Sequence, residues 1–475
     1  MKVDLGELQR WDDRICELRD AYGLDCYPQE FEICDHNEML GYMAYSGMPS
    51  RYPHWSYGKS FEKLKTLYSH GAQGLPYEMV INSDPCLAYL MGDNSLTLNV
   101  LTIAHVYGHN DFFKNNFTFA STRAEHTLSS FKSHAERVRG YIEDPSIGQS
   151  RVERILDAAH ALSLQCRRDM AIRKLSQAEQ TERAYQASLP KFDPNRDIHP
   201  EQTYVEPDLN RVPHEPEPDI LLFIRDYNPF LADWEKDLIT IVHEEAQYFI
   251  PQIETKIMNE GWASYWHYNI MRNVGLPEDM EIEFMVNHNQ VLQPHPGGLN
   301  PYHMGFMMWQ AIYERHEGPE ADDTPIDHSR RCAGTEALFQ ARESERDRSF
   351  LRRFLDEDLI RRLGLFEYGA RKGDYVVTEV ADEPGWQNIK STLIDSVGMA
   401  MIPMISVHDG DFEGNRHLYL EHDFDGRELN LENAEKTLAY AFTLWGRRVV
   451  LASMIGGKRT LLTYDEDGLS TQKPS

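Results

Sequence analysis

One stretch of the chain, residues 101–116, constrains the fold more than any other, and it reads LTIAHVYGHNDFFKNN. Its apolar side chains recur on nearly every face, so the pattern predicts a helix that is buried on all sides. His105 and His109 are four positions apart and therefore share one face of that helix. Buried imidazoles need a hydrogen-bond or metal partner, and two histidines at this spacing are the usual helical half of a zinc site.

A second stretch, residues 258–267, carries further candidate ligands and reads MNEGWASYWH. Glu260 and His267 are seven positions apart, so a helix would place both on one face. Small residues at positions 261 and 263 would allow this helix to approach the histidine helix closely. We therefore expect the two helices to meet and to hold one divalent metal ion, zinc.

The predicted metal site uses His105, His109 and Glu260 as ligands, with His267 as the fourth ligand or directly behind one. Residues 259–263, NEGWA, resemble the segment that carries the third, glutamate ligand of gluzincin metallopeptidases. The histidine pair alone is a weak indicator, because a chain with 20 histidines contains chance pairs at this spacing. The alternative hypothesis is a buried polar network of the same residues without a metal.

The sequence does not contain the general base that a zinc peptidase normally carries between its two histidines. Zinc peptidases show H-E-x-x-H, in which the glutamate polarises water, but Val106 stands at that position here. Residues 243–247, HEEAQ, lack the second histidine of that motif, so we do not interpret them as a metal site. Glu244 and Glu245 are nevertheless the candidate catalytic bases, and the alternative is that they are ordinary helix-surface residues.

Three further residues are candidates for a supporting shell or a substrate pocket. Asp111, two positions after His109, could orient a neighbouring ligand. His295 and His303 flank a loop with two adjacent glycines and could close a pocket over the site. Loop histidines usually have no such function, which is the competing interpretation.

Composition bounds the class of protein. At 475 residues we expect about two or three domains, and a hydrophobic content of 41% is typical of a globular protein. A net charge of −28 opposes binding to nucleic acid or to an anionic membrane through a broad surface field. No apolar run approaches the roughly 18 residues of a membrane span, so no membrane insertion is expected. Cysteines without a C-x-x-C pair suggest a reducing, cytoplasmic setting.

The expected fold class is α+β, with a large, mainly helical and zincin-like N-terminal region and a smaller α+β C-terminal domain. Residues 1–176 form a mainly helical region that contains the histidine helix, and residues 177–219 form a proline-rich connection. Residues 220–367 form a second helical region, which carries NEGWA and packs on the first. It opens with a short strand at residues 220–225, ILLFIR. Residues 368–475 form the C-terminal α+β domain.

Long blocks of the chain resemble the SpoVR family, named for stage V sporulation protein R. They include RYPHWSYGKSFE (51–62), INSDPCLAYL (81–90), IAHVYGHNDFFKNN (103–116), KIMNEGWASYWH (256–267), HPGGLNPY (295–302) and LNLENAEKTLAYAFTLWGRRVVL (429–451). The resemblance implies a cytoplasmic protein of bacteria or archaea, linked in spore formers to the peptidoglycan cortex and elsewhere to stress physiology. It also implies that the gene lies beside those of a PrkA-type serine kinase and a von Willebrand-A-like protein, which are the partners that we expect. The resemblance supplies no settled activity.

Two hypotheses of function follow. The first is a zincin-like metallohydrolase that lacks the standard H-E-x-x-H glutamate and acts on a peptide or a peptidoglycan-type amide. The second is a non-catalytic regulatory or scaffold protein that works with a serine-kinase system, in which the same histidines and glutamate stabilise the fold.

Overall fold

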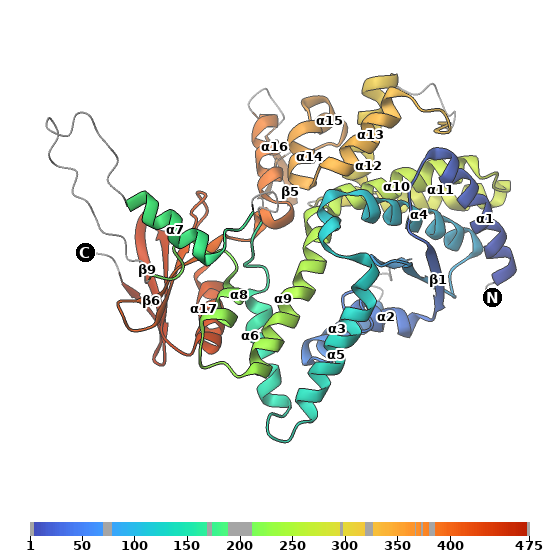
Figure 1. Ribbon diagram of the computed structural model, residues 1–475. Coiled ribbons are helices and arrows are strands. Elements are labelled where there is room, and N and C mark those ends of the chain that lie inside the picture. The colour runs from blue at the N-terminus through green and yellow to red at the C-terminus, as the bar shows by residue number, and fades with distance from the viewer. Residues whose placement is uncertain are drawn as a thin grey trace. The chain divides into compact units, whose positions relative to one another are not determined.

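The structure is a computed structural model that describes residues 4–69, 78–168, 173–188, 211–294, 298–318, 326–365, 367–371, 374–379 and 385–472 (Figure 1). The chain divides into two compact units, each built from two stretches. Unit 1 comprises Met1–Arg139 and Gln247–Met401, and unit 2 comprises Gly140–Ala246 and Ile402–Ser475. The chain passes between the units within helices α5 (Thr127–Glu143) and α9 (Asp233–Glu254).

Unit 1 is mainly helical and carries the histidine helix. Its helices are α1 (Leu5–Tyr22), α2 (His36–Ala44), α3 (Trp55–Ser69), α4 (Leu96–Asn115), η1 (Phe117–Ser121), η2 (Ala124–His126), α10 (Lys256–Asn273), α11 (Glu278–Leu292), α12 (Pro301–Glu317), α13 (Ala333–Ser344), α14 (Asp347–Phe354), α15 (Glu357–Arg362), α16 (Gly385–Asp395) and η3 (Gly398–Met401). Its strands are β1 (Gln29–Cys34), β2 (Glu78–Ile81), β3 (Cys86–Met91), β4 (Glu367–Arg371) and β5 (Asp374–Glu379).

The sheet beside the histidine helix has the strand order β1-β3-β2. Strand β3 pairs in parallel with β1 and antiparallel with β2, so β2 is an edge strand. Both β2 and β3 pack against α4. Strands β4 and β5 form a separate two-stranded sheet.

Helix α4 is the histidine helix, and it begins where Ser95 caps it. The Ser95 Oγ accepts a hydrogen bond from the backbone N–H of Leu98 at 3.1 Å. Residues 99–113 are all buried, as an apolar pattern on every face predicts. Helices α1, α10, α11 and α13 pack around it, which explains why no face of α4 is exposed over residues 99–113.

Helix α10, which carries Glu260, lies between α4 and α12 at very short backbone separation. A Cβ atom added to Gly108 of α4 would lie 2.6 Å from the Cα of Ala263. A Cβ atom added to Gly261 would lie 2.3 Å from the Cα of Gly305 in α12. Only small residues allow such approaches, so glycine is required at these crossings for packing rather than for backbone torsion. The small residue at 263 thus faces α4, whereas the one at 261 faces α12.

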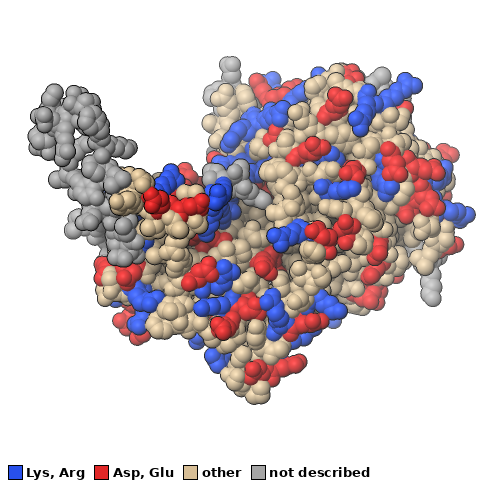
Figure 2. Space-filling view, in the orientation of Figure 1, with Lys and Arg blue, Asp and Glu red and all other residues tan. Residues whose placement is uncertain are grey.

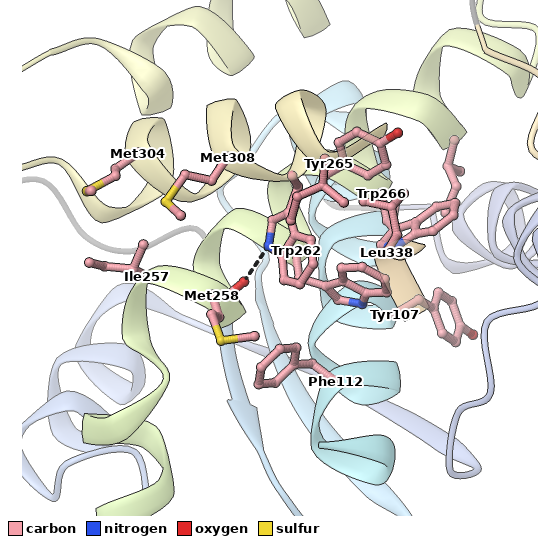
Figure 3. Close-up of a cluster of buried hydrophobic side chains, with 14 of the residues drawn as sticks. Tyr107, Phe112, Ile257, Met258, Trp262, Tyr265, Trp266, Met304, Met308 and Leu338 are labelled. Carbon is pink, nitrogen blue, oxygen red and sulfur yellow. Dashed lines mark hydrogen bonds between the residues drawn. The ribbon is translucent and has the colours of Figure 1, made fainter. Parts of the chain in front are cut away.

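Large side chains fill the space around these close contacts (Figure 3). Trp262 and Trp266 of α10 are fully buried and lie near Tyr107 and Phe112 of α4. The indole N–H of Trp309 donates a hydrogen bond to the backbone carbonyl of Met258 at 3.0 Å, which ties α12 to α10. The core of unit 1 is therefore organised around α10.

Unit 2 contains a five-stranded sheet of order β10-β9-β8-β7-β6, in which β7 and β8 are parallel and the other neighbours antiparallel. Helix α17 packs on β8 and β9, and α6 packs on α17. The elements of this unit are α6 (Gln149–Leu162), α7 (Gln177–Ser188), α8 (Ile220–Tyr227), β6 (Ile405–Phe412), β7 (His417–His422), α17 (Leu431–Trp445), β8 (Val449–Ile455), β9 (Lys458–Asp465) and β10 (Gly468–Gln472).

The strand predicted at residues 220–225 is wrong, because this segment forms helix α8. The Asp219 carboxylate accepts the backbone N–H of Leu222 at 3.0 Å and caps the helix. Ile220, Phe223 and Ile224 are buried, and this spacing of three and four is helical. A short apolar run fits either element, and here the cap and the buried face decide for the helix.

The predicted fold class, α+β, is confirmed: helices dominate the N-terminal part, and a five-stranded sheet occupies the C-terminal part. Within the described residues, no helix is both long enough and apolar enough to cross a membrane. On the face shown in Figure 2, acidic and basic side chains are interspersed, and neither sign forms a continuous field.

Candidate metal centre

Four side chains of unit 1 converge on one point: Glu78 of β2, His105 and His109 of α4, and Glu260 of α10. One ligand atom from each lies within 4.8 Å of all the others. The Nε2 atoms of His105 and His109 lie 4.0 and 3.5 Å from Glu260 Oε2, and His105 Nε2 lies 3.8 Å from Glu78 Oε1. Two nitrogens and two oxygens at these separations form a cluster that could hold a metal ion.

The orientation of His109 is set by Asn259, the residue before Glu260. Its ring Nδ1 lies 2.9 Å from the side-chain oxygen of Asn259. An amide oxygen only accepts hydrogen bonds, so the Nδ1 of His109 donates, and in the neutral form of the ring Nε2 presents a lone pair toward Glu260. Neutral imidazole in this tautomer is the form that binds a metal through Nε2.

His105 is held from behind by two further histidines. Its Nδ1 lies 2.8 Å from Nδ1 of His267, and Nε2 of His267 lies 2.8 Å from Nδ1 of His288 in α11. All three rings are buried, with exposed fractions of 0%, 0% and 3%. His267 therefore contacts the nitrogen of His105 that faces away from the cluster, and it lies behind His105.

Burial controls the charge of the cluster. It raises the pKa of Glu78 well above the usual range of a glutamate, and the charge of Glu260 raises it further. Burial also lowers the pKa of His105 well below its ordinary value, and the neighbouring histidines add to this effect. The pKa of His267 is likewise depressed by burial, and that of His288 is lowered to about 4. The imidazoles of His105, His267 and His288 are therefore neutral at neutral pH.

The donor set fits a divalent cation. Among the residues that the structure describes, the Oε2 atoms of Glu78 and Glu260 are buried without a hydrogen-bond partner. Buried oxygens of this kind are costly unless they are paired or bind a cation. A divalent cation would compensate both carboxylates and use the lone pairs of the neutral imidazoles.

A cleft of about 750 Å³ opens beside the cluster, within unit 1. Glu78, His109 and Glu260 line it together with the aromatic rings of Phe113 and Phe249. Basic side chains, Arg51 and Lys256, also reach this cleft. Its volume lies in the range of small-molecule and peptide sites, and its walls combine apolar surface with a few polar groups.

Asp111 supports the helices that carry the cluster and is bonded to other partners. Both of its carboxylate oxygens accept from Arg342 Nη1, at 2.7 and 2.8 Å, and Oδ2 also accepts from the indole N–H of Trp262 at 2.8 Å. The backbone N–H of Asp25 donates to it at 2.8 Å. Burial raises the pKa of Asp111, and Arg342 opposes that shift. Asp111 thus links α4, α10 and α13.

Among the described residues, the four-residue cluster does not include the remaining predicted residues. Glu244 and Glu245 belong to the part of α9 in unit 2, with Glu245 buried and Glu244 exposed. His303 lies in the first turn of α12, half-buried, and burial lowers its pKa. His295 lies outside the described residues.

Sequence reasoning missed Glu78, Asn259 and His288. Glu78 begins a short apolar strand, EMVI. A single carboxylate beside buried apolar residues needs a partner, and this was the one sign in the sequence that Glu78 belongs to a site. Asn259 precedes the predicted ligand within NEGWA, and His288 lies in an amphipathic stretch with nothing to mark it. Their common feature is contact across distant elements, which periodicity does not reveal.

Fold and site together define an α+β protein with a buried histidine and glutamate cluster that could hold a metal ion. The chain belongs to the SpoVR family: the model of the SpoVR like protein matches residues 2–402, and that of the SpoVR-like C-terminal domain matches residues 403–456. A relative from Escherichia coli (strain K12), named Uncharacterized protein YcgB, is 33% identical in an alignment of length 467 that covers 92% of this chain and 89% of the relative. No solved structure matches the chain.

Proposed function

We propose that the cluster binds a divalent cation, zinc, and that the protein is a metal-dependent hydrolase of an amide bond. The observation that carries this proposal is the convergence of two imidazole nitrogens and two carboxylate oxygens beside an open cleft. Imidazole and carboxylate ligands suit zinc. Catalytic zinc sites keep a position open to substrate whereas structural sites are closed, so the cleft favours catalysis.

His105, His109 and Glu260 would hold the metal, since two histidines and one glutamate are the ligand set of many zinc peptidases. When bound, a divalent cation supplies Lewis acidity, which polarises a carbonyl group and activates water near neutral pH. The glutamate of H-E-x-x-H is absent, since Val106 stands at its position. Glu78, which belongs to the same cluster, would serve as the general base instead. Its carboxylate would accept the proton of the attacking water, and the nearby cation would favour its ionised form.

The proposed substrate class is a peptide or a peptidoglycan-type amide. The cleft has room for a short peptide segment, with Phe113 and Phe249 available for apolar side chains. The side chains of Arg51 and Lys256 would favour a substrate with a carboxylate near the scissile bond. From the family resemblance we also propose a cytoplasmic setting in cortex formation or stress physiology. Glu244 and Glu245 remain the rival candidates for the base.

The second candidate is a non-catalytic regulatory or scaffold protein, and one observation favours it. The cluster offers four protein donors, which is the number that fills a closed, tetrahedral structural zinc site. In that case Glu78 is a ligand rather than a base. The protein would then act through its surface, with a PrkA-type serine kinase and a von Willebrand-A-like protein as the proposed partners.

Metal content and hydrolysis in matched variants test the proposal. Full-length protein purified without a histidine tag should bind close to one Zn²⁺ per chain, and His109→Ala should abolish this binding. Glu78→Gln should retain zinc and lose hydrolysis of a fluorogenic peptide library. Glu244→Gln and Glu245→Gln are the matched controls and should retain both properties.

Each other result decides against part of the proposal. Wild-type protein that binds no Zn²⁺ at neutral pH contradicts the metal centre. If Glu78→Gln loses zinc together with stability, Glu78 is a fourth ligand and the scaffold function is favoured. If hydrolysis survives in Glu78→Gln but is lost in Glu244→Gln or Glu245→Gln, the base is in α9.

A further inference from the structure

The side chains of His105, His267 and His288 form a continuous row of hydrogen-bonded imidazoles, which the proposed hydrolysis does not use. Both nitrogen–nitrogen distances are 2.8 Å, and the rings come from three different helices, α4, α10 and α11. The ring of His288 is packed among Tyr268, Phe284 and Phe306, at centroid distances of 4.8 to 5.7 Å. Such packing fixes the ring planes, so the hydrogen bonds cannot be exchanged by rotation.

A neutral imidazole has one donor and one acceptor nitrogen, so a row of three rings has only two possible orders. In one order His105 Nδ1 donates to His267 and His267 Nε2 donates to His288, which leaves His105 Nε2 as an acceptor. In the reverse order His105 Nε2 carries the proton and faces Glu78 Oε1 and Glu260 Oε2. Those oxygens lie 3.8 and 4.0 Å away, beyond an N–H···O hydrogen bond.

We propose that His267 and His288 are positioning residues that fix His105 in the tautomer whose Nε2 can bind a metal. This inference rests on the proposed metal centre and deepens it by naming the groups that orient one ligand. In this order His288 Nδ1 accepts from His267 Nε2, and His267 Nδ1 accepts from His105 Nδ1. Neither residue touches substrate or metal.

The other ligand histidine provides an internal precedent. The side-chain oxygen of Asn259 accepts from His109 Nδ1 at 2.9 Å. Asn259 and His267 both lie on α10, and each provides the acceptor that orients one histidine of α4. Asparagine places its oxygen close to where histidine places Nδ1. His267→Asn is therefore a conservative variant that keeps the acceptor, whereas His267→Leu removes it. His288→Asn and His288→Leu form the same pair one step further from the cluster.

The test compares these four variants in the full-length protein, with Zn²⁺ alone as the probe in competition with a chromophoric chelator. His267→Leu should lower Zn²⁺ affinity by about 10- to 100-fold, the usual cost of losing a group that orients a metal ligand. His267→Asn should bind close to wild type. His288→Leu should weaken binding less than His267→Leu, and His288→Asn should restore it.

The second readout needs no metal and separates this inference from the metal centre itself. In metal-free protein labelled with ¹⁵N-histidine, His105 should show the Nδ1–H tautomer in wild type and in His267→Asn. This preference should be lost in His267→Leu. If wild type binds no Zn²⁺ yet shows this pattern, the proposed function fails and the positioning inference stands.

Three results overturn the inference. The first is His105 in the Nε2–H tautomer in wild-type protein. The second is His267→Leu with unchanged Zn²⁺ affinity. The third is His267→Asn that loses as much affinity as His267→Leu, because a packing function would not be rescued by an amide oxygen.

Discussion

The contact between Gly261 and Gly305 makes the sharpest prediction about the fold, because it joins α10 to α12 through backbone atoms on both sides. In Gly261→Ala the new Cβ would lie 2.3 Å from both Cα and C of Gly305, and 2.8 Å from the backbone nitrogen of Phe306. Ordinary contact begins near 3.4 Å, so the helices must separate by about 1 Å or distort. No side chain is available to rotate out of the way.

The free energy of unfolding follows from two opposing effects. Overpacking of a core usually costs about 1–3 kcal/mol, and contact with backbone rather than side chain places this site at the upper end. Alanine is favoured over glycine inside a helix by up to about 1 kcal/mol. We therefore expect Gly261→Ala to destabilise unit 1 by about 2 kcal/mol.

The matched control is Gly58→Ala in α3 of the same unit. Gly58 is exposed, and a Cβ atom there would meet nothing within 4 Å. This variant should be stabilised by up to about 1 kcal/mol, because only the helix preference changes. Urea unfolding is followed by tryptophan fluorescence, to which Trp262, Trp266 and Trp309 of the unit 1 core contribute, together with Trp234 and Trp445 of unit 2. A midpoint for Gly261→Ala at or above that of wild type would refute the reasoning.

Two further variants test the buried charges of unit 1. Arg342→Met should destabilise it by about 3–5 kcal/mol in urea unfolding, because the Asp111 carboxylate would stay buried without its charge partner, and adding Asp111→Asn should recover part of the loss. Burial raises the pKa of Asp347 to about 7, so the folded state keeps a proton that the unfolded chain releases from about pH 4. Wild-type stability should accordingly fall across this range, and the stability of Asp347→Asn relative to wild type should rise from pH 5 to pH 7 and then level off.

Much of the centre could be predicted from local patterns in the sequence. The spacing of His105 and His109 follows from the helix period, and the apolar residues around them predict a buried helix, which α4 is. The small residues beside Glu260 predict close helix packing, and Ala263 lies against Gly108 as expected. The prediction that Glu260 meets the two histidines rests on chemistry rather than spacing, because two histidines and one glutamate are a common ligand set of zinc peptidases.

The remaining parts of the centre depend on contacts that no local pattern encodes. Glu78 reaches the cluster only because β2 pairs with β3, in the register that sets Glu78 opposite Leu90. His288 reaches His267 because α11 returns along α10 after a turn. The mistaken strand at residues 220–225 has a different cause. The cap, in which Asp219 accepts from the N–H of Leu222, is a local signal for a helix, and only the buried face of α8 depends on tertiary packing.

The elements that carry the four donors differ in how firmly they are held, and this difference bears on their functions. Three of the donors lie on helices α4 and α10, whose backbones pack closely where Gly108 contacts Ala263: His105, His109 and Glu260. Glu78 lies at the start of an edge strand that pairs on one side only, with β3. Metal ligands benefit from a rigid frame, whereas a general base must move a proton between water and product. We therefore expect the three helix residues to set the metal affinity and Glu78 to set the rate, so Glu78→Asp should lower hydrolysis far more than Zn²⁺ binding.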